Sequence, residues 1–500
     1  MIPAATRPLS LHPDEGACHA HRKDPCVSTG TTAPSRLDRF FEITKRGSSV
    51  GAEVRGGVVT FVAMAYIVVL NPIILSSGAD VTGATLDFAQ LSAVTALTSG
   101  VMTILFGVIA RLPFAFAAGL GINSFLAFSV VGQVTWAEAM GLVVVNGLII
   151  VLLSATGLRR MIFDAVPMQL KISITVGIGL FIAFIGFVNS GFVTATGQAS
   201  PPVGLGVGGS VATGPTIVFV VTLLITGILV ARKVKGGLLI GILAGTIIAM
   251  IVEAIFHLGS SADNPGGWSL AVPTLPSSIV AVPDLGLIGQ FSFGSFGRIG
   301  ILASLMLVFT LVFTNFFDAM GTMTGLSKEA GVADKDGTFP RLKSALIVEG
   351  VGAVVGGATS GSSNTVFVES GAGIGEGART GFANLITGVL FLLAMFFTPL
   401  TSIVPSEVAA AALVIVGCLM MAQIREIDWS DVSVTLPVFL TVTVMPLTYS
   451  IANGIGAGFI AWVIVRSLSG KARQISPLLW IVAAGFVVYF ARGPIEALVG

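Results

Sequence analysis

Long apolar segments, separated by short polar ones, run through almost the whole chain. Each segment is close in length to the roughly 20 residues that an α-helix needs to cross the hydrocarbon core of a bilayer. A closed β-barrel, the other structure that can span a membrane, requires stretches of alternating polarity about ten residues long, which this sequence lacks. A composition with 54% hydrophobic and 10% charged residues also lies far outside the range of soluble domains. We therefore predict an all-α polytopic membrane protein.

Fourteen such segments form two groups of seven, separated by a long loop over 259–298. They begin near Gly57, Gln90, Pro113, Trp136, Gln169, Thr216 and Gly237 in the first group, and near Ile299, Leu342, Ser362, Phe382, Glu407, Val432 and Ile451 in the second. We predict a disordered cytoplasmic tail over 1–38, seven-span repeats over 39–258 and 299–474, an extracytoplasmic loop between them, and a C-terminal apolar segment over 475–500. We expect residues 476–491 to lie at the interface or in a shallow hairpin.

Lysine and arginine residues mark every second loop. They precede the first span and follow the even-numbered spans, as at Arg159, Arg160 and Lys171 after span four, whereas the remaining loops hold only Arg298. Short cytoplasmic loops of membrane proteins are enriched in these residues. We therefore predict a multi-pass protein of the cell membrane with its N-terminus in the cytoplasm and the lipid bilayer as its environment.

Several functional classes are disfavoured by the polar residues. The net charge is +1, and no run rich in Lys and Arg is interleaved with aromatic residues, so we expect no nucleic-acid partner. The N-terminal tail contains His12, His19, His21, Cys18 and Cys26, but their spacing fits no zinc pattern. Nothing resembles a Walker phosphate-binding motif. We therefore expect no metal, no cofactor and no direct use of ATP.

Seven spans in each half predict two repeats of opposite orientation, and weak sequence matches support this inverted arrangement. The segment NSFLAFS over 123–129 matches NTVFVES over 364–370. The pairs Val166-Pro167 and Val404-Pro405 open spans five and twelve and are followed at the same distance by Gly179 and Gly417, and Asn71 of span one matches Asn315 of span eight. Inverted repeats predict a binding site at their interface.

The third and tenth spans are interrupted in a way that favours this interface as the site. Pro113, Gly119 and Gly121 break span three, and a series of glycines brackets span ten. The short β-like runs within both spans would leave backbone N–H and C=O groups free to pair with each other and with a polar ligand. Interrupted spans at corresponding positions of the two halves are typical of transporter binding sites.

Two carboxylates inside the apolar segments are the main candidates for function, because an ionised carboxylate in the membrane costs at least about 2.5 kcal/mol. Glu369 lies in the matched segment of span ten, directly before a glycine-rich stretch. The alternative role for Glu369 is structural, as an acceptor for the backbone N–H groups that begin the next helix. Asp318 lies one helical turn from Asn315, so both side chains project from one face.

Two further acidic residues have simpler interpretations. Glu349 in span nine is a third candidate for proton coupling, but it could instead pair with Arg379 or Lys343. Glu253 lies four residues before His257 near the end of span seven, and we expect a local pair between them. His257 is the only histidine outside the tail, so a proton relay built on histidine is disfavoured.

The residues gathered in this way suit a neutral, hydrogen-bonding ligand. The polar candidates are the neutral residues Asn123, Asn315, Ser362 and Thr365, together with the carboxylates Asp318 and Glu369. Without a Lys or Arg, such a site disfavours phosphate, sulfate or carboxylate cargo. A planar heterocycle with several N–H donors fits better, and the rings of Phe125, Phe316 and Phe317 are candidates to cover its face. A buried acid that gains and loses a proton also offers a route to proton coupling.

At these residues the chain resembles the nucleobase:cation symporter-2 family, in its AzgA-like branch of hypoxanthine, guanine and adenine permeases. The resemblance runs from about Phe40 to Ala491. It is carried by four segments, FFEITKRGSSVGAEVRGGVVTFVAMAYIVVLNPIIL at the start, AGLGINSF in span three, NFFDAMGT in span eight and VESGAGIGEGARTGF in span ten. One position departs from the pattern, because the family commonly has a carboxylate where this chain has Asn315, and asparagine carries no proton.

The resemblance implies a 14-span 7+7 inverted repeat. Spans one to four and eight to eleven would form a core domain that slides against a gate domain of spans five to seven and twelve to fourteen, and spans three and ten would meet as antiparallel half-strands. The family's substrate contacts correspond to Gly119, Gly121, Asn123, Asn315, Asp318 and Glu369, and we add Thr365 from its position. The candidates for proton coupling are Glu369, Asp318 and Glu349. A homodimer is also implied.

The sequence therefore predicts a secondary transporter that imports purine nucleobases with protons. A carrier of another planar solute, such as uracil or xanthine, and an anion carrier of the same architecture are the alternatives. The carboxylate of Glu369 would repel an anion. A passive channel would show several spans with a repeated polar face, which the sequence lacks, and with His257 alone outside the tail the chain offers little for an enzyme.

Overall fold

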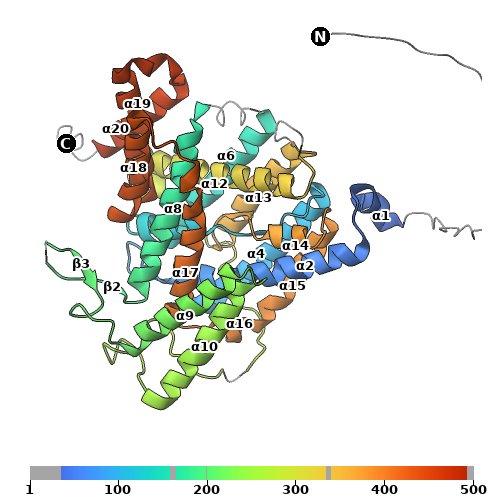
Figure 1. Cartoon of the computed structure of the whole chain (residues 1–500), viewed down its shortest axis with the longest axis vertical. Helices are drawn as coiled ribbons and strands as arrows, with labels where there is room; N and C mark the ends of the chain where they lie inside the picture. Colours follow the sequence, from blue (N-terminus) through green and yellow to red (C-terminus); the bar gives the residue numbers. More distant parts are fainter. Residues whose placement is uncertain (1–34, 158–164, 199, 277, 334–338, 492–500) are drawn as a thin grey trace, which may run out of the picture.

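The computed structural model describes residues 35–157, 165–198, 200–276, 278–333 and 339–491, and this part of the chain is almost entirely helical (Figure 1). The elements of the first half are α1 (Arg36–Phe41), α2 (Val50–Met64), α3 (Ile67–Ser76), α4 (Phe88–Ile109), β1 (Phe116–Ala118), α5 (Leu120–Phe125), α6 (Trp136–Thr156), α8 (Met168–Asn189), β2 (Val193–Ala195), β3 (Val203–Leu205), α9 (Gly214–Ala231) and α10 (Gly237–Phe256). The histidines and cysteines of the tail lie outside the described residues, and α1 crosses the predicted tail boundary at residue 38.

The second half repeats this order without a second hairpin. Its elements are α11 (Ser295–Arg298), α12 (Gly300–Glu329), α13 (Leu342–Ala358), β4 (Asn364–Val366), α14 (Ser370–Gly375), α15 (Phe382–Ala394), α16 (Thr398–Thr401), α17 (Ser406–Met421), α18 (Val432–Leu447), α19 (Ile451–Arg466) and α20 (Pro477–Phe490). Ten helices among the described residues are long and apolar enough to cross a membrane. The polytopic helical class is confirmed, and the count of fourteen spans stays a prediction, because several predicted spans form shorter or interrupted helices.

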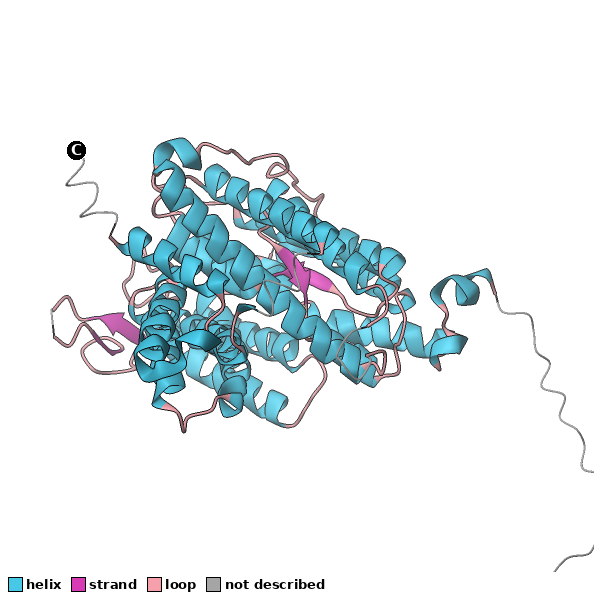
Figure 2. Ribbon diagram, turned by 90° about the horizontal axis from the view of Figure 1, so that it is seen from above, coloured by secondary structure: helices cyan, strands magenta, loops and turns pink. Residues whose placement is uncertain are grey.

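Two short strands lie enclosed among the helices (Figure 2). β1 pairs with β4 in an antiparallel register that sets Phe116 opposite Val366 and Ala118 opposite Asn364. Both strands are fully buried. The segment before β4 packs closely on α13, because Gly356 of α13 has no side chain that would collide with the carbonyl of Ser362. The second pair, β2 with β3, forms a hairpin at the edge of the molecule (Figure 2).

Glycines allow the closest helix crossings, and these crossings relate the two halves. α8 and α17 lie side by side (Figure 1), and a side chain at Gly179 would meet the carbonyl of Gly417, whereas one at Gly417 would meet the carbonyl of Gly179. In the same reciprocal way α6 meets α13 at Gly147 and Gly350. Small residues permit such close approach where lipid supplies no hydrophobic drive between helices. The reciprocal contact of Gly179 and Gly417 agrees with their predicted equivalence.

One predicted match between the halves is wrong. Asn123 lies inside helix α5, whereas Asn364 opens strand β4. The two strand-to-helix units are equivalent in structure, with β1 before α5 and β4 before α14, but the resemblance of NSFLAFS to NTVFVES is out of register with them. Both segments share composition because each forms part of an interrupted span, and composition alone does not fix the alignment.

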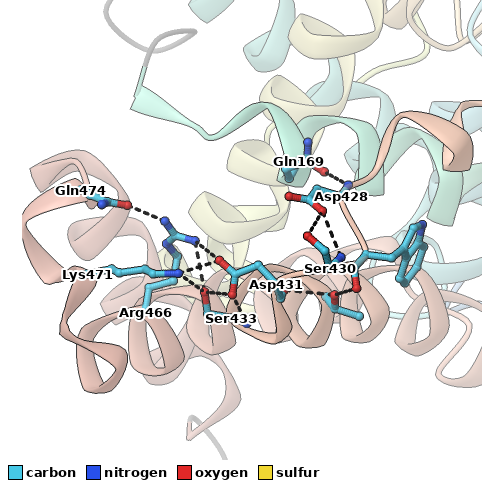
Figure 3. A network of polar contacts seen from close by, with 10 residues as sticks. Gln169, Asp428, Ser430, Asp431, Ser433, Arg466, Lys471 and Gln474 are labelled. Atoms are coloured by element: carbon cyan, nitrogen blue, oxygen red, sulfur yellow. Dashed lines mark hydrogen bonds and ion pairs between the residues drawn. The ribbon is translucent and has the colours of Figure 1, made fainter.

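The helices form two groups. α8, α9 and α10 pack with α17, α18 and α19, and the remaining long helices pack around the paired strands. At one end of the first group, Asp431 accepts a hydrogen bond from Lys471 at 2.6 Å and lies 3.6 Å from Arg466. These contacts tie the start of α18 to the end of α19 (Figure 3). Assignment of these groups as gate and core stays a prediction.

Helix α20 turns back along α19 after an irregular segment. The side chain of Phe486 is fully buried, and its ring packs against the rings of Phe309 in α12 and Phe459 in α19. A side chain at Gly456 would meet Phe486 and Phe490, so the glycine allows the two helices to approach closely. Helix α20 packs against α19, and the placement of residues 476–491 at the interface or in a shallow hairpin stays a prediction.

Candidate functional site

The candidate site is built around the antiparallel strand pair. Backbone hydrogen bonds continue beyond the strands, from the N–H of Gly119 to the carbonyl of Ser363 and from the N–H of Phe367 to the carbonyl of Ala115, both 2.9 Å. The hydroxyl of Ser370 accepts from the N–H of Ala115. These bonds satisfy the backbone where the helices are interrupted, which is necessary at membrane depth. The starts of α5 and α14 are thereby held at a fixed separation.

Asp318 lines a small cavity beside this strand pair. Gly119 and Gly121 form one wall, and Ile178 of α8 and Met420 of α17 face them from the other group of helices. The cavity holds about 20 Å³, which is room for a water molecule and not for a heterocyclic ring. The predicted contacts Gly119, Gly121 and Asp318 therefore come together, at the border between the two helix groups.

Glu369 lies at the start of α14 and is bound by a residue that the sequence reasoning missed. The hydroxyl of Tyr66 donates a hydrogen bond to Oε1 of Glu369 at 2.5 Å. Tyr66 is fully buried and lies at the irregular junction between α2 and α3. It is one of only three tyrosines in the chain, which was a signal available in the sequence. The side chain of Glu369 makes no capping bond to α14, so the alternative structural role is not observed.

Two further carboxylates lie within electrostatic range of Asp318. Asp318 is close enough to Glu369 and to Glu349 for their charges to interact. Glu349 is fully buried, near the hydroxyl of Thr365, but no hydrogen-bond donor of good geometry reaches its carboxylate among the described residues. Asp318 is therefore the member of this group that lies within range of both other carboxylates.

Among the described residues, Glu349 forms no ion pair with Arg379 or Lys343. Arg379 donates from its guanidinium to the carbonyls of Ile374 and Ala378.

The backbone N–H of Arg379 donates to Glu53, a fully buried carboxylate in α2 that also accepts from the N–H of Ala383. The sequence reasoning missed Glu53, which ties α2 to the start of α15.

A fully buried layer of neutral polar residues lies behind the cavity. Asn123, Asn315 and Thr365 are each 1% exposed or less. The amide of Asn315 donates to the hydroxyl of Ser363 at 3.0 Å. The amide atoms of Asn123 and the hydroxyl of Thr365 have no hydrogen-bond partner within the described part of the chain. Unpaired polar groups of this kind are costly unless another state supplies a partner.

The phenylalanines expected to cover a ligand ring are packed away from the cavity. Phe125 and Phe316 are almost completely buried, and neither lines the cavity. The ammonium group of Lys171 in α8 instead lies over the ring of Phe317, 5.5 Å from the ring centre. The apolar wall of the cavity comes from Ile178 and Met420, which the sequence reasoning did not single out.

The expected pair of Glu253 and His257 is also replaced by other contacts. The carboxylate of Glu253 accepts hydrogen bonds from the N–H groups of Leu258 and Gly259 and from the indole N–H of Trp268. His257 ends α10 in the left-handed conformation, where its backbone N–H bonds to the carbonyl of Glu253. The physical reason is that the chain turns at His257 and presents backbone donors to the carboxylate.

Comparison with known proteins identifies relatives of this chain. A sequence profile described as the permease family matches residues 51–457. The guanine/hypoxanthine permease PbuG of Bacillus subtilis is 39% identical over 463 residues, which cover 91% of this chain and 99% of that protein. The adenine permease AdeP of Escherichia coli is 33% identical, over 92% of this chain and 97% of that protein.

A solved structure supports the architecture. The transmembrane domain of the cyanobacterial bicarbonate transporter BicA matches with a TM-score of 0.55 at 17% identity, covering 81% of this chain and 97% of that domain. At this identity the likeness concerns the fold alone, a 7+7 inverted repeat. The profile match and the two permeases together show that the chain is a multi-pass membrane transporter rather than an enzyme, and that it belongs to the permease family of nucleobase:cation symporter-2 proteins.

Proposed function

We propose that this protein imports purine nucleobases, namely hypoxanthine, guanine and adenine, together with protons. The relatives named above are purine permeases. The observation that carries the proposal is the position of Asp318 and Glu369 beside the paired strands, with Asp318 facing a cavity whose described lining includes no Lys or Arg. Carboxylates and exposed backbone groups accept and donate the hydrogen bonds that a purine edge requires.

Transport in this proposal requires that the two helix groups move relative to each other. The cavity at Asp318 is too small for a purine because Ile178 and Met420 close it from the opposite group. Displacement of α8 and α17 from the strand pair would enlarge it, and the glycines 119 and 121 keep the facing backbone accessible. The ion pair between Lys235 and Glu376 joins the two groups and would break during such a movement.

Proton coupling is proposed to reside in the carboxylate cluster. With Asn315 neutral, the candidates are Glu369, Asp318 and Glu349. Binding of a proton to one of them relieves the repulsion within the cluster and leaves the others to accept from the purine. Release of the proton on the inner side would weaken the site and free the cargo. An anionic cargo is disfavoured, because the same carboxylates would repel it.

The test is uptake of labelled hypoxanthine, guanine and adenine into proteoliposomes with an imposed inward proton gradient. We expect uptake that is abolished by a protonophore and by excess hypoxanthine, guanine or adenine, but not by uracil, xanthine or sulfate. Glu369→Gln should abolish uptake while the purified protein keeps its melting temperature within a few degrees. Glu42→Gln, a change in a surface ion pair with Lys45, is the matched control and should transport normally. Normal uptake by Glu369→Gln would remove this residue from the mechanism.

A further inference from the structure

A second polar cavity lies far along the molecule from the strand pair, at the N-terminal ends of α9 and α17. Its volume is about 170 Å³. It is bounded by the β2–β3 hairpin, the start of α9, the loop that contains Ser269 and the start of α17. The basic loop over 232–235 lies at the opposite end of α9, so the cavity is on the face with few positive charges.

A buried carboxylate lines this cavity. Glu407 is 2% exposed. Its Oε1 accepts a hydrogen bond from the backbone N–H of Ser269 at 2.9 Å. The hydroxyls of Ser269 and Ser406 lie near the carboxylate, but no donor of good geometry reaches Oε2 among the described residues. A buried charged oxygen without a partner is costly, so a ligand that supplies positive charge or donors would be stabilised there.

The hydroxyls of Thr194 and Thr216 offer lone pairs to the cavity rather than protons. The hydroxyl of Thr194 donates to the carbonyl of Gly206, and that of Thr216 donates to the carbonyl of Ser190. Because a carbonyl can only accept, the proton positions follow from these contacts. The hydroxyl of Thr213 must then donate to Thr216, since the proton of Thr216 is already used.

The lining is therefore rich in acceptors and carries one carboxylate. Hydroxyl, carbonyl and carboxylate oxygens are the ligands that hard cations prefer. A single carboxylate balances one positive charge, whereas protein sites for Ca²⁺ are usually built from several carboxylates. An anion would be repelled by the buried carboxylate of Glu407. A nucleobase is disfavoured because none of the described residues that line the cavity is aromatic and able to cover a ring.

We propose that this cavity binds one monovalent metal cation of the Na⁺ class, with Oε2 of Glu407 and the hydroxyl oxygens of Thr194 and Thr216 among its ligands. The bound ion would join the β2–β3 hairpin to the starts of α9 and α17. It would hold this end of the helix group in one arrangement without taking part in the contacts at Asp318. The proposal is independent of which cargo the protein carries.

The test uses the purified full-length protein in detergent, with thermal unfolding followed by tryptophan fluorescence. NaCl, KCl and choline chloride are compared at equal ionic strength. Because a ligand that binds only the folded state raises its stability in proportion to the logarithm of its concentration, we expect a rise in melting temperature with Na⁺ that choline does not reproduce. A rise with both Na⁺ and K⁺ also supports a site for monovalent cations.

Variants assign the effect to the cavity. Glu407→Gln should abolish the Na⁺-dependent rise. The matched control is Glu253→Gln, a glutamate of the same face whose carboxylate already accepts three protein hydrogen bonds and faces no such cavity. It should lower the melting temperature equally in all three salts and keep the rise. Thr194→Val, on the hairpin at the edge of the molecule, should raise the Na⁺ concentration needed for half of the rise several-fold.

Two results would overturn the proposal. One is equal melting of the unmodified protein in Na⁺, K⁺ and choline. The other is a full Na⁺-dependent rise in Glu407→Gln. If Glu407→Gln does not fold, equilibrium binding of ²²Na⁺ to the unmodified protein and to Thr194→Val decides. We expect the unmodified protein to bind one ion per chain and Thr194→Val to bind it more weakly. The absence of binding, or equal binding by both proteins, would contradict the site.

Discussion

The hydroxyl of Tyr66 and Oε1 of Glu369 are joined by a hydrogen bond of 2.5 Å that links the first span to the start of α14. Tyr66 occupies the short irregular junction after α2, so the donor belongs to one interrupted helix and the acceptor to another. The bond fixes one oxygen of Glu369 against the junction of α2 and α3. Tyr66 is thus placed to position the main candidate carboxylate without itself lining the cavity at Asp318.

Tyr66→Phe should therefore impair transport more than stability. Loss of a hydrogen bond to a charged group costs about 1.5–3 kcal/mol, which corresponds to a roughly 10- to 150-fold loss in kcat/KM for purine uptake. The phenyl ring keeps the packing of the buried side chain, so we expect a small change in melting temperature. Uptake kinetics over a range of pH provide the measurement. Unchanged kinetics and an unchanged pH profile would show that the hydroxyl has no positioning role.

Asn315→Asp should change the pH dependence of uptake. The amide of Asn315 donates to Ser363, and a carboxylate cannot donate in its place. A neutral carboxylic acid can donate this hydrogen bond through its O–H group. At 0% exposure, an ionised carboxylate would also cost at least about 2.5 kcal/mol. We expect the ratio of variant to unmodified uptake to rise as the pH falls. The same ratio at all pH values, with the same competition pattern among purines, would argue against a site role for Asn315.

Gly179→Ala should destabilise the contact between α8 and α17. The added methyl group would lie 2.7 Å from the carbonyl of Gly417 and 2.7 Å from a side-chain carbon of Met420. Overpacking of this kind costs about 1–3 kcal/mol. The matched control is Gly325→Ala in α12, where nothing lies within 4 Å of the added group and alanine favours the helix by up to about 1 kcal/mol. Thermal unfolding in detergent should separate the two, and equal melting temperatures would contradict the close crossing.

Asp431→Asn should weaken the tie between α18 and α19 in a pH-dependent way. The hydrogen bond from Lys471, together with those from Ser433, holds the pKa of Asp431 below its usual range. A depressed pKa in the folded state adds stability above the pKa of the unfolded chain, about 3.9, and this stability is lost as the pH falls through the folded value. The stability difference between the two proteins should stay constant from about pH 8 to 5 and shrink below about pH 4.

The measurement for Asp431→Asn is the melting temperature across that pH range at low and high salt. Because the Lys471–Asp431 pair is partly exposed to solvent, the difference should also decrease as salt screens the charges. A difference that is independent of both pH and salt would show that the variant acts through packing or through the cap of α18.

Much of the fold could be predicted from the sequence, because the membrane allows few solutions. Runs of about 20 apolar residues require helices, and the interruptions by Pro113, Gly119 and the glycines of span ten required another way to satisfy the backbone. The strands β1 and β4 lie at those interruptions. The alignment of Asn123 with Asn364 failed because weak matches in two Gly-rich segments do not define which residues are in strand and which in helix.

The site was predicted in part, since sequence gives residue types and not their neighbours. Asp318, Gly119 and Gly121 come together as expected. Tyr66 and Glu53 were missed because each acts across the fold, on residues more than 300 positions away. The three phenylalanines were assigned to the cavity from their hydrophobicity, but that property is satisfied equally by burial among helices. Ile178 and Met420 are ordinary apolar residues, and only the crossing of α8 and α17 brings them opposite Asp318.

The reciprocal approach of Gly179 and Gly417 also limits how the two repeats can diverge. Here the space that a side chain in one repeat would fill is occupied by the backbone of the other repeat. A substitution in either half is therefore opposed by the same atoms as its counterpart, and neither position can change unless both helices separate. The two glycines therefore constrain each other, although they lie in different halves of the chain.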